Sequence, residues 1–293
     1  MRKIFLSIAL SLMFTTSAFA GLNVLATLPW IGSAAKEIGK DKVNVTVLAK
    51  PSQDAHFLEA KPSMILAARK ADIIMYDGLD LEIGYLPLVI ESSKNPKLMP
   101  GKPGNLDCSQ FITVLEKPTT VDRSMGDVHP LGNPHYHFSP SRVLRVAEGI
   151  TRLLADADKS NAAYYEANYK AFAERLHEKE KQWHAVQLQG KKYIAYHKYF
   201  EYLADEFGFR FIGYLEPKPG IPPSAGHIEG LIETMKKEKP TAILVTPAYG
   251  MQAAESLSAK TGVKVIVLPH DVGSMDNTGD LISFWDKINT LLK

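Results

Sequence analysis

Short apolar runs alternate with amphipathic stretches along most of the chain. In the first half, the apolar runs lie at 22–28, 43–48 and 72–76, and the stretch 61–70 has helical spacing. Parallel strands are buried on both faces by helices, so they read as continuous apolar runs. The alternation therefore predicts an α/β fold with a mostly parallel sheet flanked by helices.

The same alternation returns in the last third of the chain. The strands predicted there are 193–196, 209–214, 241–246 and 263–268, and the helices are a segment ending at Phe207, 227–238, 252–261 and 279–292. We find no sequence repeat between the two halves, so they share only the alternation of strands and helices. This alternation predicts a second α/β lobe with the same architecture as the first.

A long helical pattern lies between the two halves. An amphipathic helix is predicted at 141–155, and a second pattern follows at 161–188 without Gly or Pro before Gly190. At 1.5 Å per residue the second helix would be roughly 40 Å long. We interpret it as a connector between two lobes; the alternative is a long surface helix of a single domain.

The first twenty residues have the pattern of a signal peptide. Arg2 and Lys3 precede the apolar segment 4–14, and Ala18-Phe19-Ala20 is a small-x-small cleavage site. We expect secretion, with a periplasmic location if the source has an outer membrane. The expected division is residues 1–20 for the signal peptide, 21–158 for the N-terminal lobe, 159–189 for the connecting helix and 190–293 for the C-terminal lobe.

Composition and charge exclude several classes of protein. The chain has 293 residues, of which 45% are hydrophobic and 23% charged, which is ordinary globular composition. Residues 1–20 hold two of the 34 basic side chains and none of the 32 acidic ones, so 32 of each remain. A balanced chain without a basic stripe argues against a nucleic-acid partner. Cys108 is alone, so we expect a buried, inert thiol.

Several of the nine histidines lie at the ends of predicted strands. His56 lies in the loop after the second strand, His197 directly follows a strand, and His270 and Asp271 directly follow another, while His135 precedes the long helices. Loops beyond the carboxyl ends of parallel strands line the crevice of such folds. Three imidazoles with one carboxylate would make a plausible zinc site. Any one strand-end histidine, however, is more often a surface or hydrogen-bonded residue.

Four short motifs give the chain a family resemblance. They are Asp54-Ala55-His56 followed by Lys61-Pro62-Ser63, Gly132-Asn133-Pro134-His135-Tyr136, Ala195-Tyr196-His197-Lys198 and His270-Asp271-Val272-Gly273. With these motifs the chain resembles the metal-specific substrate-binding proteins of bacterial ABC importers, the zinc and manganese group with a rigid connecting helix. The motifs occur in the family's order and span the mature chain.

The resemblance implies a ligand set and a function. His56, His135 and His197 match the family's three nitrogen-ligand positions, and Asp271 matches its late carboxylate. Members that bind manganese are expected to have Glu where this chain has His197, and imidazole suits Zn²⁺. The resemblance thus implies a monomer that binds Zn²⁺ as transported ligand, with Mn²⁺ or iron as alternatives, and delivers it to an ABC permease without catalysis.

Some alternatives stay open at this stage. The fourth ligand could be Asp271, His270, His137 or water, although packing or support of the ligands ranks above ligation for His137. For His129 we expect simple exposure in a loop rather than transient metal capture. A secreted zinc hydrolase with Glu59 as general base is the main rival function. A metallochaperone or a metal-dependent adhesin could use the same scaffold.

Overall fold

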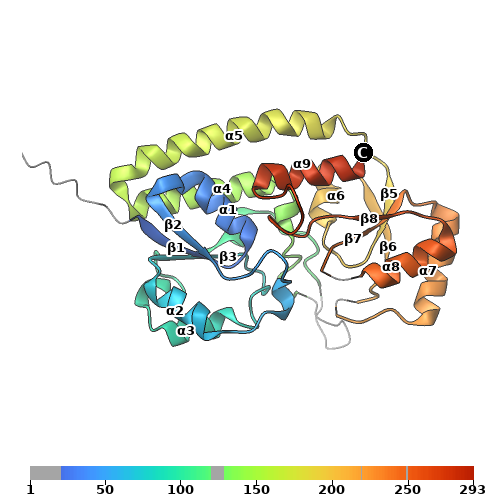
Figure 1. Ribbon diagram of the computed structural model, residues 1–293, viewed down its shortest axis with the longest axis horizontal. Helices are drawn as coiled ribbons and strands as arrows, with labels where there is room; N and C mark the ends of the chain where they lie inside the picture. Colours follow the sequence, from blue (N-terminus) through green and yellow to red (C-terminus); the bar gives the residue numbers. More distant parts are fainter. Residues whose placement is uncertain (1–20, 120–128, 219, 249) are drawn as a thin grey trace, which may run out of the picture.

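Two four-stranded parallel sheets form the frame of the molecule (Figure 1). The computed structural model describes residues 21–119, 129–218, 220–248 and 250–293, so the predicted signal peptide lies outside the described residues. The first sheet has the order β2-β1-β3-β4, with β1 at Leu22–Ala26, β2 at Val43–Val47, β3 at Ile73–Tyr76 and β4 at Asn105–Asp107. The second has the order β6-β5-β7-β8, with β5 at Lys192–Ala195, β6 at Arg210–Tyr214, β7 at Ala242–Val245 and β8 at Val265–Val267.

Helices flank both sheets. In the described part of the chain they are α1 Pro29–Gly39, α2 Pro62–Lys70, α3 Leu86–Ser93, α4 Pro140–Ala157, α5 Ala162–His184, α6 Glu201–Phe207, α7 Ala225–Glu238, α8 Met251–Thr261 and α9 Leu281–Leu292. None of these helices has the length and apolar character needed to cross a membrane. The predicted fold class, two α/β lobes joined by a long helix, is confirmed.

The connecting helix α5 runs along one side of the molecule, over α4 and α1 of the first half, and reaches toward the second (Figure 1). It ends at His184, earlier than the predicted 188. The helical spacing of apolar residues continues through Val186 and Leu188, but Leu188 is buried by the chain beyond the helix end. Buried apolar residues keep a helical pattern going in the sequence although the backbone has already turned. The boundaries predicted for the two lobes stay a prediction.

The two sheets share one hydrophobic core. One face of the second sheet, with Tyr193 and Ala195, belongs to the same core as the first sheet and as Phe284 and Trp285 of α9. The opposite face, with Ile194, forms a smaller core with α7 and α8. Protein interiors are close-packed and resist deformation. A large hinge motion between the halves would therefore have to break this common core.

Three elements were not predicted from the sequence. Helix α1 is amphipathic, because Trp30, Ile31 and Ala34 lie on one buried stripe and Lys36 is exposed on the opposite side. Its apolar residues follow the apolar run 22–28 directly, and Pro29, Gly32 and Gly39 weaken the helical signal in the sequence. Strand β4 has three residues and helix α3 has eight, and both are short for pattern analysis.

Replacing Trp285 tests the common core. Its ring is fully buried, lies 5.8 Å from the Trp183 ring between centroids, and donates from Nε1 to the His137 carbonyl at 3.1 Å. Trp285→Ala should lower the free energy of unfolding by about 3–5 kcal/mol, because it leaves a cavity and an unpaired carbonyl. Urea unfolding of the metal-free protein measures this, with Leu66→Ala, 55% exposed on α2, as the control. A loss below about 1 kcal/mol would contradict the role we assign to this ring.

Candidate metal centre

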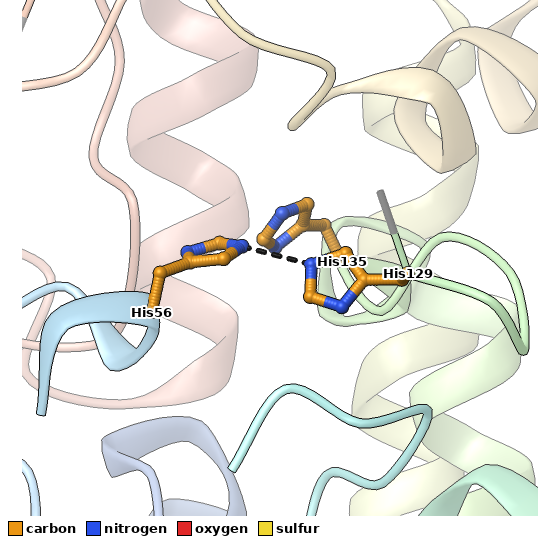
Figure 2. Close-up of side chains that lie close together, drawn as sticks. All are labelled: His56, His129 and His135. Atoms are coloured by element: carbon orange, nitrogen blue, oxygen red, sulfur yellow. Dashed lines mark hydrogen bonds between the residues drawn. The ribbon is translucent and has the colours of Figure 1, made fainter. Parts of the chain in front are cut away.

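Three imidazole rings point toward one another between the two halves (Figure 2). His56 Nε2 lies 3.0 Å from His129 Nε2, and His135 completes the group. One ring nitrogen from each residue falls within 4.8 Å of the others. Nitrogens that bind one tetrahedral zinc ion at about 2.0–2.1 Å are roughly 3.3 Å apart. The group is therefore close to the size that a single ion requires.

A fourth imidazole, from the second half, lies beside this group. The His197 ring centroid is 5.5 Å from those of both His56 and His135. His56 follows β2 and His197 follows β5, so both come from the carboxyl ends of parallel strands. Loops at these ends meet at the crevice of an α/β fold. The three predicted nitrogen positions thus lie together, and the two halves contribute to one centre.

The position of His129 differs from the one expected from the sequence. We expected it to be simply exposed in a loop, but it is partly buried and in contact with His56. The turn from its carbonyl to the Gly132 N–H, at 3.1 Å, directs the loop back to the centre. Burial, followed by the adjacent His56 and His197 rings, lowers the pKa of His129 to about 3. This ring is neutral at physiological pH and has the form that binds metals.

Carboxylates orient two of the rings from outside. Asp54 Oδ1 lies 2.6 Å from His56 Nδ1, and Glu216 Oε2 lies 2.5 Å from His197 Nδ1. Each carboxylate favours a proton on Nδ1 and leaves the Nε2 lone pair for the centre. Burial opposes ionisation of Asp54, but hydrogen bonds from His56 and Tyr199 outweigh it, so the pKa of Asp54 lies below its usual value.

His135 is the most enclosed of the four rings. It is 3% exposed, and its Nε2 has no hydrogen-bond partner among the residues that the structure describes. Burial first, and then the surrounding imidazoles, hold its pKa well below the usual value. A buried polar atom without a partner is costly and calls for an explanation. A metal ion at the centre would supply the missing partner.

Asp271 lies at the same edge of the fold but faces other partners. Its carboxylate accepts a hydrogen bond from the Val272 N–H at 2.6 Å and faces the backbone N–H of Trp30, in the first turn of α1. No hydrogen bond joins it to the imidazoles within the described ranges. Burial raises its pKa to about 8. Its assignment as a ligand stays a prediction.

The other candidates from the sequence lie around the centre. His137 stacks on Trp30, with ring centroids 6.0 Å apart, and donates from Nε2 to the His270 carbonyl at 2.8 Å. The His270 ring nitrogens are buried and have no hydrogen-bond partner in the described part of the chain. Glu59, the base of the hydrolase alternative, is exposed. Cys108 is fully buried, and burial raises the pKa of its thiol, as an inert cysteine requires.

Sequence reasoning also missed Tyr199 and Glu216. Glu216 follows β6 at a strand end, which is the same signal that selected the histidines, and could have been found that way. Tyr199 donates to Asp54 Oδ2 at 2.5 Å, and its ring centroid lies 4.3 Å from that of His135. Nothing in its local sequence indicates this, because Asp54 lies in the other half of the chain.

Two clefts adjoin the centre from different sides. One is lined by Asp54, His56, His197 and Glu216. The other is lined by residues that include Glu116, His129, His135, His197 and Lys198. His197 borders both clefts, and each cleft is lined by two or more of the imidazoles. An ion can therefore reach the rings without opening the common core.

Comparison with known proteins gives a consistent result. The family described as "Zinc-uptake complex component A periplasmic" matches residues 24–290. The iron-binding protein YfeA of Yersinia pestis is 25% identical over 278 residues, which cover 89% of this chain and 84% of that protein. The high-affinity zinc uptake system protein ZnuA of Bacillus subtilis is 25% identical over 253 residues, which cover 84% and 77%.

The similarity extends to three dimensions. A crystal structure of ZnuA superimposes with a TM-score of 0.77 at 26% identity, and covers 93% of this chain and 100% of its own. The match in sequence runs through both halves and through all the loops that carry the imidazoles. The chain therefore belongs to the family of the periplasmic component A of the zinc-uptake complex.

Proposed function

We propose that this protein binds a divalent metal ion outside the cytoplasm and delivers it to the membrane permease of an ABC importer, and that the ion is Zn²⁺. The observation that carries the proposal is the convergence of His56, His129, His135 and His197 on one centre between the two sheets. The family consists of metal-binding transport proteins. The location we propose is the periplasm, with residues 1–20 as a cleavable signal.

The chemistry of the donors supports zinc over the alternatives. At least three of the four proposed ligands are imidazoles, and imidazole suits Zn²⁺, whereas Mn²⁺ favours oxygen ligands. The relatives compared above are named for iron and for zinc, so the family itself leaves the metal open. Iron and manganese are the alternatives to be tested beside zinc.

The ligands that we propose are His56, His135 and His197, with Asp271 as the fourth. His129 competes for the fourth position, because its Nε2 already lies 3.0 Å from His56 Nε2. Either set gives four protein ligands and leaves no open position for a reactive water. This arrangement supports transport without catalysis, in a monomer whose partner is the permease.

Removal of one imidazole tests the centre directly. We expect the protein purified without added metal to contain one zinc ion per chain, measured by elemental analysis. His197→Ala should lower zinc affinity by more than the roughly 10–100-fold that loss of an outer partner costs, because it removes a ligand. His184→Ala, exposed on α5, is the control and should keep full zinc content. Equal zinc in both variants would overturn the proposal.

The pH dependence distinguishes the two candidates for the fourth ligand. Burial raises the pKa of Asp271 to about 8, so below that pH the carboxyl carries a proton that zinc must displace. If Asp271 binds zinc, wild-type affinity should fall by up to about tenfold per pH unit from pH 8 toward pH 5. Burial keeps the pKa of His129 at about 3, so this ring adds no such competition.

The matching variants are Asp271→Asn and His129→Ala, with the exposed Asp276→Asn as control. We expect Asp271→Asn to bind zinc more weakly than the wild type at pH 8 and with a flatter pH profile. Isothermal titration calorimetry in two buffers, which counts the protons released, measures the same difference. If Asp271→Asn leaves affinity and proton release unchanged while His129→Ala weakens binding, His129 is the fourth ligand.

A further inference from the structure

One side chain joins the two loops that carry His135 and His197. Asn133 Oδ1 accepts a hydrogen bond from the His135 N–H at 2.9 Å. Its Nδ2 donates to the Lys198 carbonyl at 2.8 Å and to Glu116 Oε2 at 3.0 Å. Asn133 is 7% exposed, so both hydrogens of its amide are used inside the protein.

The backbone of Asn133 is held as firmly as its side chain. Its N–H donates to the Leu115 carbonyl at 2.9 Å, and its carbonyl accepts from the Tyr202 hydroxyl at 2.7 Å. Tyr202 is fully buried on α6, in the second half of the molecule. At the adjacent Gly132, with φ at +115°, a Cβ would lie 2.2 Å from the Val114 side chain. Only glycine lets the loop approach this closely.

These bonds connect ligands from different sheets. His135 precedes α4 and His197 follows β5, and Asn133 bridges the N–H of the first to the carbonyl directly after the second. A buried hydrogen bond is stronger in the low dielectric of the interior and costly to leave unmade. One amide thus ties together the backbones that carry His135 and His197, whose ring centroids lie 5.5 Å apart.

We infer that Asn133 is a positioning residue that sets the spacing of His135 and His197 and so makes the centre discriminate among divalent ions. The inference rests on the proposed function. Zinc sites are tetrahedral with bonds of about 2.0–2.1 Å, and protein sites select metals by geometry and ligand type more than by affinity alone. A spacing that cannot relax favours the ion that fits it.

Asn133→Asp is the test variant, because it changes the hydrogen bonds with little change of shape. The carboxylate keeps the acceptor for the His135 N–H. It loses the donor, however, and places a negative oxygen against the Lys198 carbonyl and the Glu116 carboxylate. The side-chain bond to the Lys198 carbonyl is therefore replaced by repulsion, while the bond from the Tyr202 hydroxyl to the backbone of residue 133 stays.

Asn95→Asp is the matched control. Asn95 is 8% exposed, its Nδ2 donates to the carbonyls of Ala68 and Ala71 at 2.9 and 2.7 Å, and its Oδ1 accepts from the Lys97 N–H at 3.1 Å. Asn95 resembles Asn133 in its burial and in the hydrogen bonds that its amide donates and accepts. Its partners, however, lie on and beside α2, away from the imidazoles. The control reproduces the structural cost of the substitution without touching the centre.

The measurements are zinc and manganese affinities, by competition with a chromophoric chelator, and the visible absorption spectrum of the protein loaded with Co²⁺ in place of zinc. For Asn133→Asp we expect zinc affinity to fall about 10–100-fold, as for other outer partners of metal ligands. The ratio of zinc to manganese affinity should fall with it, and the cobalt bands should shift. Asn95→Asp should lower stability and leave the affinities and the spectrum at wild-type values.

An unchanged affinity ratio and cobalt spectrum in Asn133→Asp would overturn the inference, whatever the loss of stability. If this variant does not fold, the double variant Asn133→Asp with Glu116→Gln replaces it, because it removes the repulsion between carboxylates and still lacks the bond to the Lys198 carbonyl. The double variant should keep the altered ratio, and a wild-type ratio would overturn the inference. Failure of the wild type itself to bind zinc would instead refute the proposed function.

Discussion

The structure depends on holding four imidazoles close together inside the protein. Burial lowers the pKa values of His129 and His135, so these two rings are neutral at physiological pH and add no positive charge to the group. The same burial deprives His135 Nε2 of a partner in the described part of the chain. The fold thus holds a buried ring nitrogen without a partner beside three other imidazoles, and a divalent cation at the centre would supply that partner.

The frame around the centre explains how this arrangement is maintained. The first sheet, one face of the second sheet and α9 share a single core, and α5 lies along it. Outside this core, Arg142 at the start of α4 donates to Asp205 on α6 at 2.7 Å, which is a further contact between the two halves. Because the frame resists hinge motion, loading and release of an ion must be carried by the loops that present the imidazoles.

Much of this fold could be predicted from the sequence, because buried parallel strands and a long helix leave periodic patterns. Helix α1 was not predicted, because its apolar residues directly follow the apolar run of β1 and Pro29, Gly32 and Gly39 weaken the helical signal. His56 and His197 were found because strand ends converge in α/β folds. The position of His129 depends on the path of a loop through the folded molecule. The position of Tyr199 depends on its contact with Asp54, which is distant in sequence. Neither leaves a local pattern.

The charges around the centre bear on which fourth ligand the site needs. Four neutral imidazoles add no charge to a divalent ion, and a buried ion without counter-charge is costly. Two carboxylates, Asp54 and Glu216, supply negative charge around the centre. Each is hydrogen-bonded to the Nδ1 atom of a ligand ring rather than placed to contact the ion itself. This pair balances a divalent ion without Asp271, whose carboxyl faces the backbone of Val272 and Trp30 and keeps its proton up to about pH 8. The charge balance therefore allows the fourth bond to come from a neutral ring, and this is the physical reason why His129 competes with Asp271.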